Sequence, residues 1–140
     1  GICALSLPFL SQFLVNHFIP FVCYLGINFE APQKIRIVNE LASENLFIRN
    51  LLIRPTAEEL TSYGEPDFTI IATPGLKCNP IIDGTRSEAA ILVDYELRTV
   101  LITGTRYAGE IKKSVFSIMN YLLPDEGVLP MHCSANMSMV

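Results

Sequence analysis

The chain has 140 residues, and 50% of them are apolar, which is enough to bury the core of one domain but not comfortably of two. Lys and Arg total 10 against 14 Asp and Glu, giving a net charge of -4, and the basic residues form no stripe; this excludes a nucleic-acid binder. The cysteines lie far apart without a C-x-x-C pair, which predicts buried free thiols in a reducing compartment rather than a zinc or redox site. They are Cys3, Cys23, Cys78 and Cys133.

The segment before Glu30 contains no Asp, Glu, Lys or Arg. Its length meets the test for a membrane span, but Pro8 and Pro20 interrupt a single helix and no basic cluster flanks it. Three interpretations stay open: a hydrophobic arm or buried edge of a larger domain, sequence unrelated to the remaining fold, and a membrane segment. We treat residues 1–33 as an uncharged hydrophobic arm and 34–140 as the domain. Because the sequence starts with Gly rather than Met, we expect a processed product or a piece of something longer.

The first charged stretch predicts a strand and two helices. Residues 34–38 alternate charged and apolar side chains, which is the period of a half-buried strand. A helix follows with Asn39 as its N-cap, and Pro55 ends its pattern. The apolar residues at helical spacing are Leu41, Leu46, Phe47 and Leu51. Residues 56–59 read Thr-Ala-Glu-Glu, a capping box for a short helix that ends near Gly64.

Three further strands are predicted downstream. Residues 67–72 are rich in β-forming side chains and are followed by Pro-Gly. Residues 89–94 and 99–103 form a hairpin or two neighbouring strands. Residues 77–86 contain Pro, Asp and Gly without periodicity, so we predict a loop there.

Residues 110–123 form the strongest helix pattern, which Pro124 ends. Its apolar stripe consists of Ile111, Val115, Ile118, Met119 and Leu122. Residues 129–132 are a candidate strand that returns toward the sheet. Strands interleaved with helices in this way predict an α+β (mixed α/β) fold, with a mixed sheet and flanking helices.

Gly104 and Gly109 have the separation of the glycines in a phosphate-binding loop. However, Glu110 and Ile111 stand where such a loop needs Lys and then Ser or Thr. Without the lysine no positive charge meets the phosphates, and without the hydroxyl magnesium lacks a ligand. The segment is not a Walker loop.

Four side chains with useful chemistry surround the start of the long helix: Tyr107, Lys112, Lys113 and His132. A helix, a turn and a strand can bring them together. Histidine is a common ligand of transition metals, and a lysine joins it only when burial and a neighbouring cation lower its pKa. Lys112 is such a cation for Lys113, although two lysines in a first helical turn oppose the helix dipole. Spacing alone leaves open a solvated lysine pair and a core histidine.

Several longer strings of the sequence occur in the order and at the spacing of one known family. They are NLFIRNLLIRPTAEEL (45–60), EPDFTII (65–71), DGTRSEAAILVD (83–94), and GTRYAGEIKKSVFSIMNYLLP with GVLPMHCSAN (104–136). Together they resemble ATP-dependent phosphoenolpyruvate carboxykinase from about residue 34 to residue 136. The resemblance implies that 34–140 is part of the N-terminal (substrate) domain of that family.

The resemblance also implies a chemistry: conversion of oxaloacetate and ATP to phosphoenolpyruvate, carbon dioxide and ADP, a gluconeogenic step in the cytoplasm. It implies Mn²⁺ held by Lys113 and His132, which also approach ATP, with Mg²⁺ accompanying the nucleotide. Tyr107 and Lys113 match substrate-binding residues, and Lys112 and Lys113 match catalytic ones. Neither nucleic acid nor a membrane is an expected partner.

The chain departs from the family after residue 136, where the family continues into a phosphate loop. A further aspartate ligand and the family's arginines have no counterpart in this sequence. We therefore expect a fragment that is inactive alone and poorly soluble. The alternatives are a non-catalytic, truncated carboxykinase-like protein with a binding or structural role, and membrane attachment through residues 1–28.

Overall fold

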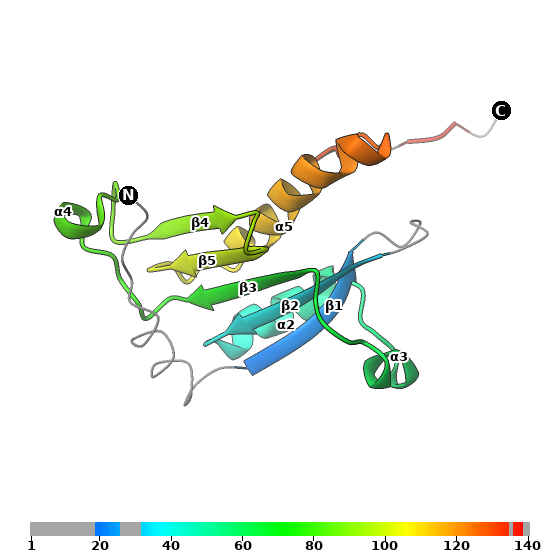
Figure 1. Ribbon diagram of the computed structural model, residues 1–140, viewed down its shortest axis with the longest axis horizontal. Helices are drawn as coiled ribbons and strands as arrows, with labels where there is room; N and C mark the ends of the chain where they lie inside the picture. Colours follow the sequence, from blue (N-terminus) through cyan, green and yellow to red (C-terminus); the bar gives the residue numbers. More distant parts are fainter. Residues whose placement is uncertain (1–18, 26–31, 135, 139–140) are drawn as a thin grey trace.

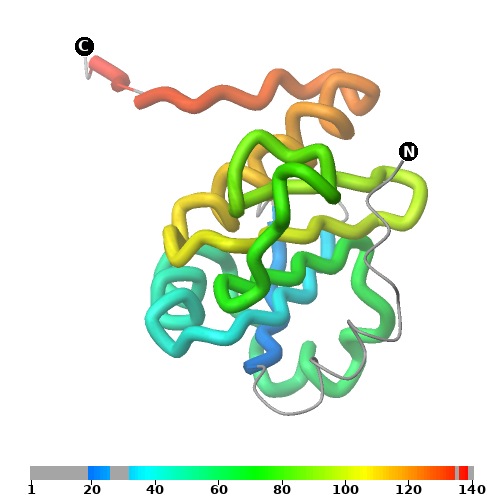
Figure 2. Tube along the Cα trace, turned by 90° about the vertical axis from the view of Figure 1, so that its left-hand side faces the viewer, coloured from blue at the N-terminus to red at the C-terminus, as the bar shows by residue number. Residues whose placement is uncertain are grey.

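The computed structural model describes residues 19–25, 32–134 and 136–138. Five strands form one sheet in the order β1-β2-β3-β5-β4, and helices α2 and α5 lie against one face of it (Figures 1 and 2). This is the α+β class that the sequence predicts. In chain order the elements are β1 (Ile19–Leu25), β2 (Gln33–Asn39), α2 (Ala42–Leu51), α3 (Ala57–Thr61), β3 (Phe68–Thr73), α4 (Pro80–Asp83), β4 (Ala90–Asp94), β5 (Thr99–Thr103), α5 (Gly109–Leu122) and the 3-10 turn η1 (Leu123–Glu126).

The inner strands β2, β3 and β5 run parallel, and the edge strands β1 and β4 pair antiparallel with their neighbours. Because β2 and β3 are adjacent and parallel, the chain between them must cross over, and α2 forms part of that crossover. The carboxyl ends of the inner strands therefore meet at one edge, where Asn39 pairs with Ala72 and Thr73 with Thr103. In sheets of this kind, ligands bind beside the carboxyl ends of the strands.

Strand β1 lies inside the stretch that has no charged residues. Ile19–Leu25 pairs with β2 along its whole length, and Pro20 fits an edge strand because one side of such a strand needs no ladder partner. The remainder of that stretch falls within residues 1–18 and 26–31, which lie outside the described residues, and so does Cys3. Within the part of the chain that is described, no helix is long and apolar enough to cross a membrane.

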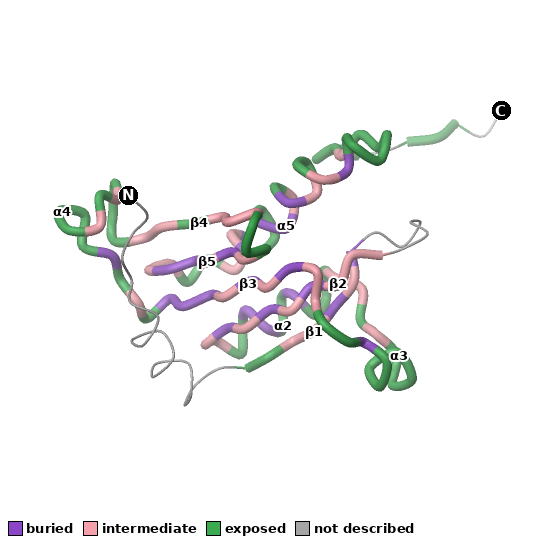
Figure 3. Tube along the Cα trace, viewed as in Figure 1, coloured by how far each residue is buried: buried purple, intermediate pink, exposed green. Residues whose placement is uncertain are grey.

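The core lies between the sheet and the two helices (Figure 3). Ile48 of α2 and Ile118 of α5 are each 1% exposed. They pack against fully buried sheet residues, among them Ile35, Ile37, Ile70 and Val100. The Tyr63 hydroxyl donates to the carbonyl of Cys23 at 2.7 Å and so fastens the segment after α3 to β1. Truncating one of the buried isoleucines to alanine would cost about 2–5 kcal/mol.

Most predicted elements are confirmed. The strands around residues 34–38 and 67–72 are β2 and β3, and the two strands after them form an antiparallel hairpin. The capping box of α3 is present: the Glu59 amide donates to Thr56 Oγ1 at 3.2 Å, and the Thr56 amide donates to Glu59 Oε2 at 2.7 Å. On α5, the predicted stripe residues Ile111, Val115 and Ile118 are buried.

Helix α2 differs from the prediction at its start and in its buried face. Asn39 is the last residue of β2 and not an N-cap; Leu41 precedes the helix and makes no side-chain cap. The predicted apolar stripe faces outward, with Leu46 64%, Phe47 39% and Leu51 42% exposed. The side that meets the sheet consists of Glu44, Asn45 and Ile48. Only Glu40 and Leu41 join β2 to α2, so this short connection fixes the rotation of the helix whatever its hydrophobic pattern favours.

Three smaller expectations are wrong. The predicted loop at 77–86 contains the short helix α4, which Asn79 caps by accepting the Ile81 amide at 3.0 Å. Residues 129–132 form no strand; Leu129 is 76% exposed, and Pro130 cannot donate to a ladder. Cys23 and Cys78 are buried free thiols as predicted, but Cys133 is exposed because it lies in this extended tail.

Candidate active site

The site lies where β5 ends and α5 begins, at the carboxyl edge of the parallel strands. Gly104 follows β5 with φ +67°, and a Cβ there would lie 2.1 Å from the Glu88 carbonyl oxygen, so only glycine fits the turn. A Cβ at Gly109 would lie 2.5 Å from the Tyr107 ring. The two glycines therefore serve a tight turn and the seating of a tyrosine against the helix start.

A pocket of about 370 Å³ occupies this position. Its lining consists of Phe47, Tyr107, Gly109, Lys112, Lys113, Phe116 and His132. All four side chains singled out in the sequence thus border one cavity, although His132 comes from the extended tail rather than from a strand. The Lys113 amine lies 5.2 Å from the centre of the Tyr107 ring, and the His132 ring centre lies 5.7 Å from that of Phe116.

The charge of Lys113 differs from the expectation. Its amine donates to Glu110 Oε1 at 2.9 Å, and this hydrogen bond together with the charge of Glu110 raises the pKa of Lys113. The expected lowering of the pKa of Lys113 is therefore not observed, because the carboxylate of Glu110, one helical turn away, determines the direction of the shift. With both lysines charged at the start of α5, the amino end of the helix dipole adds to a positive pocket that favours anions.

The pocket can supply only part of a metal site. His132 offers an imidazole nitrogen, and Lys113 offers an amine nitrogen once it releases its proton and Glu110. Among the described residues no group of three or more His, Cys, Asp and Glu side chains could hold a metal ion. A divalent ion needs more ligands than these two nitrogens, so an ion bound here would take its remaining ligands from elsewhere.

Sequence reasoning missed three residues of this site. Phe47 was assigned to the core face of its helix, but it lines the pocket, as does Phe116. Glu110 was noted only as a departure from a Walker loop, although its i, i+3 spacing to Lys113 is a recognised ion-pair signal. The placement of Phe47 carries no sequence signal, because it depends on how α2 and α5 lie side by side.

A second polar group lies at the same edge of the sheet. Glu44 in α2 is 2% exposed, and burial together with the charge of Glu40 raises its pKa to about 7, against the opposing charge of Arg106. Its Oε2 has no hydrogen-bond partner among the described residues. Asn39 is fully buried, and its Oδ1 and Nδ2 also have no partner there. Arg106 directly precedes Tyr107, so this buried carboxyl group is linked electrostatically to the loop of the site.

The fold and the pocket define a class: an α+β protein that offers a positively charged site where a helix begins beside the carboxyl ends of parallel strands. A comparison with protein families identifies the particular one. A family model described as phosphoenolpyruvate carboxykinase matches residues 9–139, and the chain belongs to that family. The matched range also includes part of the uncharged N-terminal stretch.

Individual relatives agree. The chain is 58% identical over 113 residues to phosphoenolpyruvate carboxykinase (ATP) of Geobacillus thermodenitrificans, covering 81% of this chain and 21% of the relative. It is 63% identical over 114 residues to phosphoenolpyruvate carboxykinase (ATP) 1 of Moorella thermoacetica, covering 81% and 22%. It is 56% identical over 115 residues to phosphoenolpyruvate carboxykinase (ATP) of Fusobacterium nucleatum, covering 82% of this chain and 22% of the relative. The chain thus spans about a fifth of the length of the curated relatives it matches.

Proposed function

We propose that this chain supplies part of the active site of an ATP-dependent phosphoenolpyruvate carboxykinase. The complete enzyme would convert oxaloacetate and ATP to phosphoenolpyruvate, carbon dioxide and ADP, as a gluconeogenic step in the cytoplasm. The observation that carries the proposal is the single pocket bordered by Tyr107, Lys112, Lys113 and His132. The family match and the names of the relatives support it.

The positive charge of the pocket suits the reactants, since oxaloacetate, phosphoenolpyruvate and ATP are all anions. Lys112 and Lys113 would attract their carboxylate and phosphate groups and stabilise negative charge that develops during decarboxylation. Tyr107, 62% exposed, presents a hydroxyl that can orient the substrate beside Lys113. The rings of Phe47 and Phe116 supply the apolar part of the pocket wall beside these groups.

Lys113 and His132 would hold the divalent ion, Mn²⁺ in this proposal, while Mg²⁺ accompanies the nucleotide. A divalent ion, when bound, supplies Lewis-acid stabilisation of an enolate oxygen. The role of Glu110 is then to accept the hydrogen bond of Lys113 in the resting chain and to release it when the amine acts as a ligand. Because the pocket offers only two nitrogen donors among the described residues, we expect no turnover from the 140-residue polypeptide by itself.

A chimaera tests this proposal. The matched residues of this chain replace their counterparts in the G. thermodenitrificans relative, and formation of phosphoenolpyruvate from oxaloacetate and ATP is measured with Mn²⁺ and Mg²⁺. We expect activity in the chimaera, a loss of at least about hundredfold in its Lys113→Ala and His132→Ala forms, and little change in Arg54→Ala, which alters an exposed cation outside the pocket. A folded, inactive chimaera would contradict the proposal and favour a binding or structural role.

A further inference from the structure

We infer that Phe116 is a positioning residue whose ring holds the His132 imidazole on the side of the pocket that carries the Lys113 amine. The inference rests on the proposed function, because it takes from there the roles of His132 and Lys113 as ligands of the divalent ion. Phe116 would touch neither the ion nor a reactant. Its part is to restrict the positions of a neighbouring side chain before the ion binds.

The segment that carries His132 has few contacts of its own. After η1 the chain runs extended toward its red end in Figure 2, and residues 128–134 belong to no helix or strand. The Val128 amide donates to the Leu123 carbonyl at 3.0 Å, but residues 129–134 make no backbone hydrogen bond with any described residue. Segments of this kind sample several conformations, and a metal ligand on one of them binds only while it faces the site.

The contact with Phe116 limits this freedom. The centres of the two rings are 5.7 Å apart, and their planes are inclined by 54°. This separation is within the range of about 4.5–7 Å at which aromatic pairs attract each other. Phe116 is half-buried in α5, whereas His132 is exposed, so the ring pair joins a side chain of the tail to a fixed element of the fold.

The spacing along α5 places this contact beside Lys113. Lys113 and Phe116 are three residues apart, so they lie on the same face of the helix, and both line the pocket together with His132. The rotation of α5 is fixed by the buried stripe that packs into the core, which consists of Ile111, Val115 and Ile118. An imidazole that rests on Phe116 is therefore held on the face of α5 that presents the Lys113 amine.

Lys113 does not depend on Phe116 in the same way. Its amine donates to Glu110 Oε1 at 2.9 Å and lies 5.2 Å from the centre of the Tyr107 ring. Both contacts come from the start of α5 and the loop before it. Loss of the Phe116 ring is therefore expected to release His132 and to leave Lys113 in place, which distinguishes a positioning role from a general loss of the pocket.

Metal affinity measures the consequence. The apparent Kd of a metal rises in proportion as the fraction of molecules with a correctly placed ligand falls. We expect Phe116→Leu to raise the Kd for Mn²⁺ by about two- to tenfold, which is the range that an aromatic pair contributes to an equilibrium. The measurement uses Mn²⁺ alone, without reactants, and follows the EPR signal of the free ion in the chimaera described above. Phe116→Tyr keeps the ring and is expected to retain the parent Kd.

NMR on the metal-free 140-residue chain measures the contact itself. The chain has two histidines, His17 and His132, so His17→Gln leaves a single imidazole to observe. We expect a nuclear Overhauser effect between the ring protons of His132 and Phe116, and a change in the His132 chemical shift in Phe116→Leu but not in Phe116→Tyr. Absence of the Overhauser effect in the folded parent chain overturns the inference, whether or not the Phe116→Leu variant folds.

Phe47→Leu is the matched control. It makes the same change in another ring of the same pocket wall, and Phe47 has no ring contact with His132 among the residues that the structure describes. We expect the His132–Phe116 Overhauser effect to persist in this variant and the Kd for Mn²⁺ to change less than in Phe116→Leu. An equal rise of Kd in both variants would assign the effect to the apolar wall and contradict positioning by Phe116.

His132→Ala separates the inference from the proposed function. If this variant loses Mn²⁺ affinity and Phe116→Leu keeps it, the inference is overturned and the proposed function stands. If His132→Ala retains the parent affinity, His132 is not a ligand, and the proposed function falls together with the inference. A loss in both variants, larger in His132→Ala and reversed in Phe116→Tyr, is the result that supports Phe116 as a positioning residue.

Discussion

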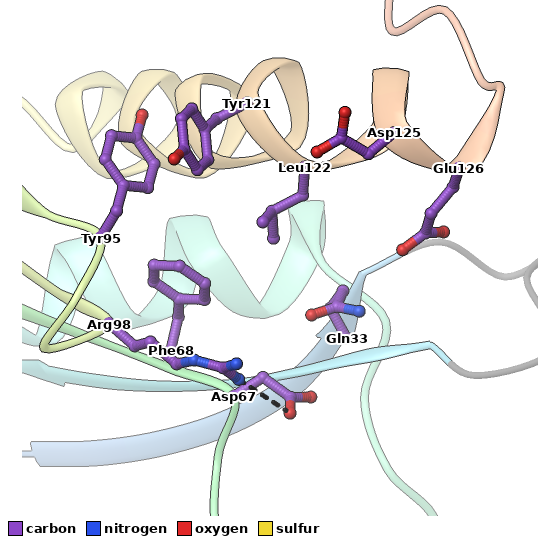
Figure 4. A pocket seen from close by; sticks show the side chains of 9 residues that line it. All are labelled: Gln33, Asp67, Phe68, Tyr95, Arg98, Tyr121, Leu122, Asp125 and Glu126. Atoms are coloured by element: carbon purple, nitrogen blue, oxygen red, sulfur yellow. Dashed lines mark ion pairs between the residues drawn. The ribbon is translucent and has the colours of Figure 1, made fainter.

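Two pockets of about 370 Å³ each lie at opposite ends of α5, and their charges have opposite signs. The pocket at the start of the helix holds Lys112, Lys113 and His132. The pocket at its end, shown in Figure 4, holds the carboxylates of Asp67, Asp125 and Glu126 beside a single cation, Arg98. Both sets of charges oppose the α5 dipole, which favours acids at the amino end and bases at the carboxyl end.

The acidic pocket has a local explanation. The Lys34 amide donates to Asp67 Oδ2 at 2.8 Å, and Arg98 lies 4.0 Å from the other carboxylate oxygen. Asp125 and Glu126 lie in the first turn of η1, where negative charge is favourable. Asp67 therefore joins the start of β2 to the residue before β3, and Arg98 adds a contact from the residue before β5.

The basic pocket has no such explanation within the fold. Lys112 is exposed and forms no ion pair among the described residues, and Lys113 pairs only with Glu110 inside its own helix. Positive charge at the start of a helix costs stability unless an anion binds there. Among the described residues, the charge of Lys112 at the start of α5 has no partner, and the pocket that it borders is the candidate active site.

The largest expected effect separates the two pockets by activity. In the chimaera, Lys113→Ala is expected to lower kcat/KM by at least about hundredfold, because it removes an amine that we propose as a ligand of the divalent ion. Asp125→Asn in the acidic pocket is expected to change kcat/KM by less than about twofold. Similar losses for both variants would remove the distinction between a functional and a structural pocket.

The next effect concerns Glu44, the buried carboxyl group at the carboxyl edge of the parallel strands. Glu44 has a folded pKa of about 7 against an ordinary value of 4.5, so the folded chain binds this proton more tightly than the unfolded chain does. The free energy of unfolding is therefore expected to fall by about 3 kcal/mol as the pH rises from about 5 to about 7. Denaturant unfolding between pH 5 and 8 measures this loss.

Glu44→Gln is expected to remove this pH dependence and to be more stable than the parent chain at pH 8. The control is Glu126→Gln, an exposed carboxylate of the acidic pocket, which should leave the pH dependence in place. If the parent chain becomes more stable between pH 5 and 7, the buried group does not titrate in this range.

A smaller effect tests the structural role of the acidic pocket. Tyr95 and Tyr121 stack there with ring centres 3.9 Å apart, which ties the β4–β5 hairpin to α5 (Figure 4). Tyr121→Ala is expected to cost about 1–2 kcal/mol of stability, from lost stacking and contact area, without changing the KM of the chimaera. A change in KM at unaltered stability would give this pocket a role in binding instead.

The smallest effect lies at the start of α5. Lys112→Gln removes one unfavourable interaction with the helix dipole and should stabilise the chain by about 0.3–1 kcal/mol while lowering activity in the chimaera. Arg49→Gln is the control, because Arg49 is exposed in the last turn of α2, where a positive charge agrees with the helix dipole. Stabilisation of the same size by both substitutions would point to net charge rather than to the dipole.

The sequence was most informative where local chemistry and the final fold agree. The alternation in β2, the capping box of α3 and the stripe of α5 each satisfy a local rule that the structure keeps. It was least informative for α2, whose polar Glu44 and Asn45 face the sheet while Leu46 and Phe47 face outward. A periodicity argument assumes that the most apolar face is buried, and a connection of two residues overrides it.

The sequence alone singled out the side chains that we propose to carry the chemistry, and the strings around Tyr107, Lys113 and His132 indicated the family. The tertiary structure decided that these side chains meet in one cavity with Phe47. His132 lies in a tail without secondary structure, and Phe47 lies in α2, which connects β2 to β3. The charge of Lys113 was also decided there, by its contact with Glu110. Residue types and local patterns follow from the order of amino acids, whereas distances between segments, and the pKa values that depend on them, exist only once the chain has folded.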